Sequence, residues 1–86
     1  MAFYFVQSVK AGQDGLIAGL NVRAPHGESR FLSRDEAISV LVDGGTLRGD
    51  HNLIFASSVE GRYYLKTVPV QTTGDNLDGF RVEAAS

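Results

Sequence analysis

The side chains in this sequence that could do acid–base or metal chemistry are two histidines and the carboxylates near one of them. His26 lies in the polar segment 24–28, and His51 directly follows Asp50. Asp43 and Asp50 could bring oxygen ligands toward the His51 imidazole, but this spacing matches no usual metal-ligand pattern. Neither histidine lies in a recognisable nucleophile motif. The sequence therefore assigns no catalytic residue, no metal ligand and no cofactor. It favours a protein that is not an enzyme, with a small hydrolase or a metal protein as an alternative.

Length and composition restrict the kinds of protein that this chain can be. Its 86 residues suffice for one hydrophobic core, so we expect a single domain over residues 1–86. Hydrophobic residues make up 43% and charged residues 21%, as in ordinary globular domains, and there is no cysteine for a disulfide or a thiolate metal site. No apolar run approaches the about 20 residues that span a bilayer, and the chain start lacks the pattern of a signal peptide. We expect a cytoplasmic protein with no membrane partner.

The N-terminal part of the sequence is typical of a β-hairpin. Residues 3–9 are rich in aromatic and β-branched types, and the segment 12–15 holds turn residues that tolerate positive φ. Apolar residues then recur at every second position, which predicts a strand that buries one side and turns Asn21 and Arg23 to water. The residues expected to be buried on this strand are Leu16, Ala18, Leu20 and Val22.

A helix is predicted directly after Phe31 and Leu32, which we expect to lie in the core. Ser33 and Glu36 have the spacing of a capping box, in which each side chain hydrogen-bonds the backbone amide of the other residue. The glycine pair 44–45 ends the helix, because glycine readily adopts the left-handed conformation that satisfies the last carbonyls. The residues expected to face the sheet are Ala37, Ile38, Leu41 and Val42.

A second hairpin is predicted on the two sides of Glu60 and Gly61. The flanking runs, 53–59 and 62–68, are rich in strand-forming residues. With a two-residue turn, one face carries Phe55, Ser57, Val59, Arg62, Tyr64 and Lys66, and the other carries Ile54, Ala56, Ser58, Tyr63 and Leu65. A slip of one residue would exchange these faces. We expect the tail to fray from Val82 onward.

Together these elements predict an α+β fold. The expected architecture is a mainly antiparallel sheet of four to five strands with one helix on one face. The expected order is ββαββ, with room for an extra short strand after the helix at residues 46–48.

One helix can cover only one face of such a sheet, so the other face is open to water or to a partner. The residues predicted to form a binding face there are Phe55, Arg62, Tyr64 and Lys66. Tyr, Phe and Arg are favoured at protein interfaces, whereas the same rings and cations could stack unpaired bases and meet phosphates. A net charge of −2 gives no general attraction to nucleic acid. A protein partner or a homodimer is therefore the favoured expectation, and single-stranded nucleic acid is the alternative.

Two short motifs add a resemblance to a known family. Tyr64-Leu65-Lys66-Thr67 and, after a turn-rich stretch, Gly74-Asp75-Asn76-Leu77 follow the helix and the hairpin. This order resembles the domain-of-unknown-function family three-eight-nine-two, a widespread bacterial and phage family, although the segment 69–73 replaces a polar turn. The resemblance implies a short stand-alone bacterial or phage protein and carries over no catalytic residue. We therefore expect a small non-enzymatic interaction module, such as a phage- or prophage-encoded accessory protein or inhibitor.

Overall fold

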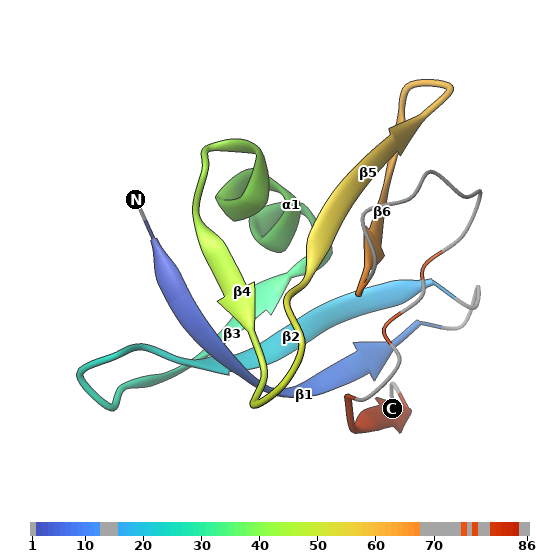
Figure 1. Cartoon of the computed structure of the whole chain (residues 1–86). Coiled ribbons are helices and arrows are strands. Elements are labelled where there is room, and N and C mark those ends of the chain that lie inside the picture. Colours follow the sequence, from blue (N-terminus) through green and yellow to red (C-terminus); the bar gives the residue numbers. More distant parts are fainter. Residues whose placement is uncertain (1, 13–15, 68–74, 76, 78–79, 85–86) are drawn as a thin grey trace.

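A computed structural model shows how the chain folds, and it describes residues 2–12, 16–67, 75, 77 and 80–84. The elements are β1 (Phe3–Ala11), β2 (Ile17–Arg23), β3 (Ser29–Ser33), α1 (Arg34–Val42), β4 (Thr46–Arg48), β5 (Phe55–Val59), β6 (Arg62–Lys66) and β7 (Val82–Ala84) (Figure 1). The predicted α+β class, with one helix and a mostly antiparallel sheet of about five strands, is confirmed. The predicted ββαββ order is only partly right, because a third strand precedes the helix and β5–β6 forms a sheet of its own.

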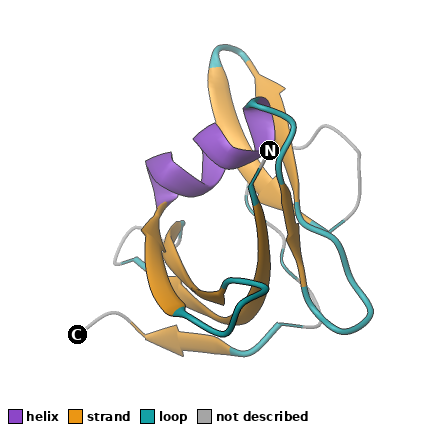
Figure 2. Cartoon of the chain, turned by 90° about the vertical axis from the view of Figure 1, so that its left-hand side faces the viewer, coloured by secondary structure: helices purple, strands orange, loops and turns teal. Residues whose placement is uncertain are grey.

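The main sheet has the strand order β3-β2-β1-β4, and β7 also pairs with β1. Two short strands share one edge of the long strand β1, since β4 pairs in parallel with residues 3–5 and β7 with residues 9–11. A parallel neighbour requires a crossover connection, and α1 lies in the connection between β3 and β4. The extra strand expected after the helix is confirmed as β4. Figure 2 shows the main sheet curving strongly beneath α1.

Two β-bulges decide which residues of β1 and β2 face the core. The register of this antiparallel pair shifts at Gln7 and at Ala18, so each of these residues lacks a partner across the ladder. A bulge moves the alternation of faces by one residue, and for this reason Ile17 is buried while Ala18 is exposed. Leu20 and Val22 are buried as predicted, whereas Leu16 is only half-buried and the prediction for Ala18 is wrong.

Both predicted ends of α1 are confirmed. The Ser33 hydroxyl accepts a hydrogen bond from the Glu36 amide (3.2 Å), and the Glu36 carboxylate accepts one from the Ser33 amide (3.2 Å). At the other end Gly44 adopts a φ of 88°, and the amides of the glycine pair donate to carbonyls of the last helical turn. These local signals therefore fix the length of the helix.

The apolar side of α1 is centred on slightly different residues from those predicted. Ala37 is fully buried, and Ile38, Val40 and Leu41 are half-buried against the core. Val42 is 56% exposed, because it lies about 100° around the helix from Leu41 and points away from the core. The prediction for Val42 is therefore wrong, and Val40 takes its place.

Phe31 does not return to the core as predicted. In β3 it pairs with Asn21 and faces the side opposite to buried Leu32, with 48% of its surface exposed. Its ring lies over Gly19, where an added Cβ would come within 2.2 Å of the ring. A glycine at this position thus leaves room for the ring on the outside of the sheet.

The second hairpin has the predicted register. Its turn consists of Glu60 (φ 52°) and Gly61 (φ 77°), and Phe55 pairs with Lys66 across the strands. Positive φ at both turn residues gives the twist that suits a two-residue hairpin. The two predicted sets of face-sharing residues are therefore confirmed, and the face with Leu65 turns toward the core.

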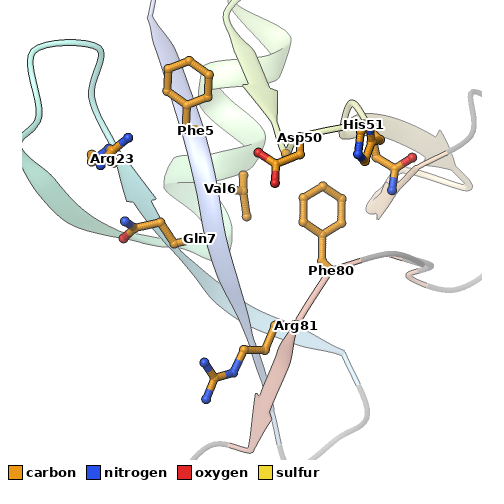
Figure 3. A pocket seen from close by; sticks show the side chains of 10 residues that line it. Phe5, Val6, Gln7, Arg23, Asp50, His51, Phe80 and Arg81 are labelled. Atoms are coloured by element: carbon orange, nitrogen blue, oxygen red, sulfur yellow. The ribbon is translucent and has the colours of Figure 1, made fainter.

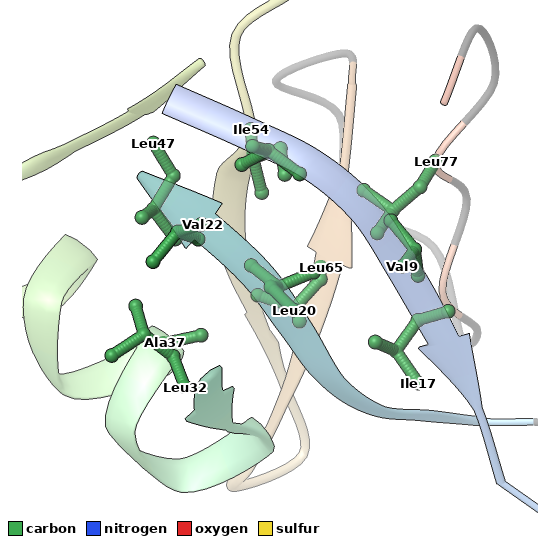
Figure 4. Close-up of a cluster of buried hydrophobic side chains, with 11 residues drawn as sticks. Val9, Ile17, Leu20, Val22, Leu32, Ala37, Leu47, Ile54, Leu65 and Leu77 are labelled. Carbon is green, nitrogen blue, oxygen red and sulfur yellow. The ribbon is translucent and has the colours of Figure 1, made fainter. Parts of the chain in front are cut away.

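One core joins the two sheets and the helix (Figure 4). Its buried side chains are Val6, Val9, Ile17, Leu20, Val22, Leu32, Ala37, Leu47, Ile54, Leu65 and Leu77. The Ile54 amide donates to the Leu47 carbonyl (2.9 Å), which attaches the hairpin to β4. One end of the hairpin is thereby held at the core, while its turn projects from the rest of the chain (Figure 1).

Residues 82–84 of the tail form a strand, so the predicted fraying is wrong for these residues, and residues 85–86 lie outside the described part of the chain. β7 pairs with β1 in parallel. The Glu83 carboxylate also accepts hydrogen bonds from the Ser8 hydroxyl (3.2 Å) and from the Asn21 side-chain amide (3.3 Å). These partners are distant in sequence, so the residue types of the tail alone give no sign of them.

Candidate binding surfaces

Three of the four residues predicted for the binding face line a groove between α1 and the β5–β6 hairpin, so the expectation that they lie on a sheet face away from the helix is wrong. Arg62 and Tyr64 line a hollow of about 500 Å³ on its β6 side, and Phe55 lines a hollow of about 290 Å³ on its β5 side. Tyr63 lines both hollows, so they adjoin. These two hollows together are called the helix–hairpin groove.

The fourth predicted residue, Lys66, lies elsewhere. Its side chain is fully buried (0% exposed), and its Nζ lies 5.9 Å from the centroid of the Tyr64 ring, within the range of a cation–π contact. Lys66 therefore does not present its ammonium group at an open face, which corrects the expectation for this residue. The alternation along a strand indicates which side a residue faces, but it does not indicate whether that side is covered.

The β5 side of the helix–hairpin groove gathers exposed apolar side chains. Val42, Leu53 and Tyr63 are 56%, 44% and 42% exposed, and all three line the smaller hollow together with half-buried Phe55. They come from the end of α1, the loop before β5, and β6. Neighbouring exposed apolar groups in a hollow are typical of interaction sites.

A buried ion pair fixes the position of α1 relative to the hairpin. The Asp75 carboxylate, 3% exposed, accepts hydrogen bonds from both terminal nitrogens of Arg34, the first residue of α1 (2.5 and 3.0 Å). It also accepts from the backbone amides of Ile17 in β2 (2.7 Å) and Leu65 in β6 (2.9 Å). Arg34 donates in turn to the Tyr63 carbonyl (2.9 Å). One carboxylate thus links α1, β2 and β6, and it supports the walls of the groove.

The electrostatics of Asp75 favour its charged form. Burial by itself raises the pKa of this carboxyl, but the hydrogen bonds from Arg34, Ile17 and Leu65, together with the positive charge of Arg34, outweigh burial and hold the pKa below its ordinary value. The carboxylate is therefore ionised at neutral pH, as its ion pair requires.

A third hollow, of about 580 Å³, lies beside β1 (Figure 3). Its lining residues are Phe5, Val6, Gln7, Arg23, Gly49, Asp50, His51, Asn52, Phe80 and Arg81. They come from β1, from the end of β2, from the loop between β4 and β5, and from the residues before β7. We call this hollow the Phe5 pocket.

The Phe5 pocket contains one of the two histidines that the sequence offered for acid–base or metal chemistry. His51 and Asp50 line it side by side, whereas His26 is exposed in the loop before β3 and Asp43 caps the end of α1. The described residues that line the pocket include no serine, threonine or lysine that could act as a nucleophile beside the imidazole. Within the described part of the chain, no group of three or more His, Cys, Asp or Glu could hold a metal ion. Two guanidinium groups and two phenyl rings instead suit the binding of an anion that carries flat rings.

Sequence reasoning missed Tyr63, which is central to the helix–hairpin groove, and Phe5, which lines the Phe5 pocket. It assigned Tyr63 to the core-facing side of the hairpin, and it treated Phe5 only as part of a strand. The sequence did contain a sign that aromatic rings lie on the outside of the sheet, because Phe3 and Phe5 alternate with Tyr4 and Val6 along one strand. One of these two sets must lie on the outside of the sheet.

No helix in the part of the chain that the structure describes is long and apolar enough to span a membrane. A comparison of this chain with protein-family models, with curated proteins and with solved structures found no match. The helix–hairpin groove, the Phe5 pocket and their lining residues are therefore the observations from which a function can be inferred.

Proposed function

We propose that this chain is a small non-enzymatic interaction module that binds a protein partner, or a second copy of itself, through the helix–hairpin groove. The observation that carries this proposal is that Val42, Leu53 and Tyr63, 42% to 56% exposed, surround one hollow. Exposed apolar groups that cluster in this way favour a protein interface over an ordinary solvated surface.

Tyr63 is the expected anchor of the contact. Its side chain lines both hollows, and tyrosine is enriched among the residues that dominate binding energies at interfaces. The smaller hollow suits an apolar side chain of the partner. Arg62 and Asp35 line the larger hollow, where they offer charged groups at the rim of the contact.

The setting of this function is part of the same proposal. The motif at residues 64–67 and the later motif at residues 74–77 support a bacterial or phage origin through the family resemblance. Phage- or prophage-encoded accessory proteins and inhibitors act by occupying a surface of a larger protein. A small module that binds through a groove is suited to this role.

The test is the capture of a partner from bacterial lysate on the immobilised chain, followed by calorimetry with the protein identified by mass. Tyr63→Ala should weaken binding about 30-fold, which corresponds to about 2 kcal/mol, and Arg62→Ala about fivefold. Sedimentation velocity with the same variants covers self-association.

The matched control is Phe31→Ala, which removes an equally exposed ring from the main sheet and should leave the affinity unchanged. Melting curves establish that each variant is folded. Full affinity in folded Tyr63→Ala and Arg62→Ala would reject the helix–hairpin groove as the binding surface.

A further inference from the structure

Two exposed phenylalanines lie side by side on the outer face of the main sheet. Phe3 and Phe5 are 36% and 38% exposed, and their ring centroids are 5.0 Å apart with an interplanar angle of 77°. They alternate along β1 with Tyr4 and Val6, which contact the core on the other face. Phenyl rings are usually buried, so an adjacent pair of exposed rings points to an interaction site.

Arginines flank Phe5 on both sides. Phe5 pairs in register with Arg23 of β2 and with Arg48 of β4, and residues paired in this way point to the same face of a sheet. Arg23 is exposed, and Arg48 is half-buried with its Nε donating to the Gly49 carbonyl (3.3 Å). Across the sheet, the Phe5 ring thus lies between the guanidinium groups of Arg23 and Arg48.

The Phe5 pocket adds further aromatic and cationic side chains beside Phe5. Figure 3 shows Arg23 on one side of β1 and His51 and Phe80 on the other, with Arg81 below them. The guanidinium groups of Arg23 and Arg81 form no hydrogen bond or ion pair with other side chains that the structure describes. Asp50 supplies the single carboxylate among the described lining residues, so cations are in excess at the pocket.

Charge is distributed unevenly over the molecule. The chain has a net charge of −2, yet its helix carries Asp35 and Glu36 in the first turn and Asp43 at its end. Arg34, the basic residue of that helix, is neutralised by Asp75. Glu36 is paired with Arg30, and the Glu83 carboxylate lies on the outer face of the sheet, where Ser8 and Asn21 hydrogen-bond it. Among the described residues near Phe5, the three guanidinium groups of Arg23, Arg48 and Arg81 exceed the two carboxylates of Asp50 and Glu83, and this local excess favours an anion there.

We propose that the outer face of the main sheet binds single-stranded nucleic acid. Bases stack on Phe5 and Phe3, phosphates contact Arg23, Arg48 and Arg81, and the Phe5 pocket receives part of one nucleotide. Rings on a sheet can stack only on bases whose faces are free, which selects single strands over duplexes. This surface shares no residue with the helix–hairpin groove, and its function does not depend on the one proposed there.

Fluorescence anisotropy of a labelled oligothymidine of about eight nucleotides tests the proposal, because single-strand sites of this kind span about 4–16 nucleotides. Binding is expected at about 50 mM salt and should weaken about 20-fold by about 200 mM salt. This factor follows from three phosphate contacts, each of which contributes about 0.7 to the slope of log affinity against log salt concentration.

Two variants separate stacking from charge. Phe5→Leu keeps the apolar bulk and removes the ring, so the affinity should fall about tenfold. Arg23→Ala should weaken binding and lower the salt slope by about 0.7. Arg62→Ala is the matched control, because it removes another exposed guanidinium, from the helix–hairpin groove, and should leave oligonucleotide binding unchanged.

Several results would overturn the proposal. They are no anisotropy change at about 50 mM salt, equal affinity for a duplex of the same length, equal affinity for a mononucleotide, and full affinity in folded Phe5→Leu. None of these results bears on capture by the helix–hairpin groove, since Tyr63→Ala and Arg62→Ala test that surface on their own.

Discussion

The Asp75 carboxylate accepts four hydrogen bonds from three elements of the fold. Two come from the Arg34 side chain, and the others come from the amides of Ile17 and Leu65. A buried carboxylate is stable only when such partners compensate for the water that it loses. The geometry of the helix–hairpin groove therefore depends on a single ionised residue outside the groove.

Asp75→Asn should lower the free energy of unfolding by about 3 kcal/mol. The amide retains the shape of the side chain but leaves the Arg34 guanidinium without its counter-charge, and breaking a buried pair on one side is strongly destabilising. Urea unfolding at neutral pH measures the change. Asp50→Asn, at an exposed position, is the control and should stay within about 0.5 kcal/mol of wild type. A loss below about 1 kcal/mol for Asp75→Asn would show that the ion pair is not a main support of the fold.

Acid should remove the stability that the Asp75 carboxylate contributes to the fold. The pKa of Asp75 is lowered in the folded state, so the unfolded chain binds the proton more readily. The stability from Asp75 is then fully present above the unfolded pKa of about 4, and it is lost as the pH falls through the lower folded pKa. Urea unfolding from about pH 7 to about pH 3 should show a drop below about pH 4 in wild type that is smaller in Asp75→Asn. Parallel curves for the two proteins would contradict this assignment.

At the scale of elements, the β5–β6 hairpin combines a well-formed turn with one unfavourable residue. Glu60 adopts a φ of 52°, in the left-handed region that favours glycine and asparagine, and Gly61 adopts 77°. An added Cβ at Gly61 would meet no atom within 4 Å, so a substitution there acts through backbone strain alone.

Two opposite changes of stability are expected from this turn. Glu60→Asn should stabilise the chain by about 0.5 kcal/mol, because Asn-Gly is a preferred sequence for such turns, and Gly61→Ala should destabilise it by about 1 kcal/mol. Thermal or urea unfolding of the two variants measures both. The same sign for both substitutions would be inconsistent with the observed turn geometry.

The strand β7 gives a test of the tail. Deletion of residues 82–86 removes the parallel pairing with β1 and the Glu83 contacts to Ser8 and Asn21. The free energy of unfolding should fall by about 2 kcal/mol, since several net hydrogen bonds of about 1 kcal/mol or less are lost. Hydrogen exchange at residues 9–11 of β1 should also become faster. Unchanged stability and exchange would mean that the tail frays, as the sequence alone indicated.

At the scale of the whole molecule, the sequence predicted the features that local signals determine. The Ser33–Glu36 capping box, the end of the helix at Gly44 and the register about Gly61 depend on neighbouring residues, and the structure confirms all three. Each of these signals names a backbone conformation or a hydrogen bond that the residues themselves supply.

Features that depend on distant segments were not predictable in this way. The bulge at Ala18 reverses the faces of the start of β2, and the pairing of β7 with β1 is set by an edge that β4 leaves free. Lys66 has an outward-facing register position but is buried. For the binding sites, three of the four expected residues line the helix–hairpin groove. Tyr63 was assigned to the core-facing side, because the alternation along a strand does not show whether that side is covered.

The helix–hairpin groove is proposed as the surface at which this protein meets a partner. An amide chemical-shift map of the isotope-labelled chain, titrated with the captured and identified partner, tests it without any substitution. The largest shifts should fall at Val42, Leu53 and Tyr63, with smaller ones along α1. Shifts centred on Phe5 and Arg23 instead, with the groove unperturbed, would contradict the claim.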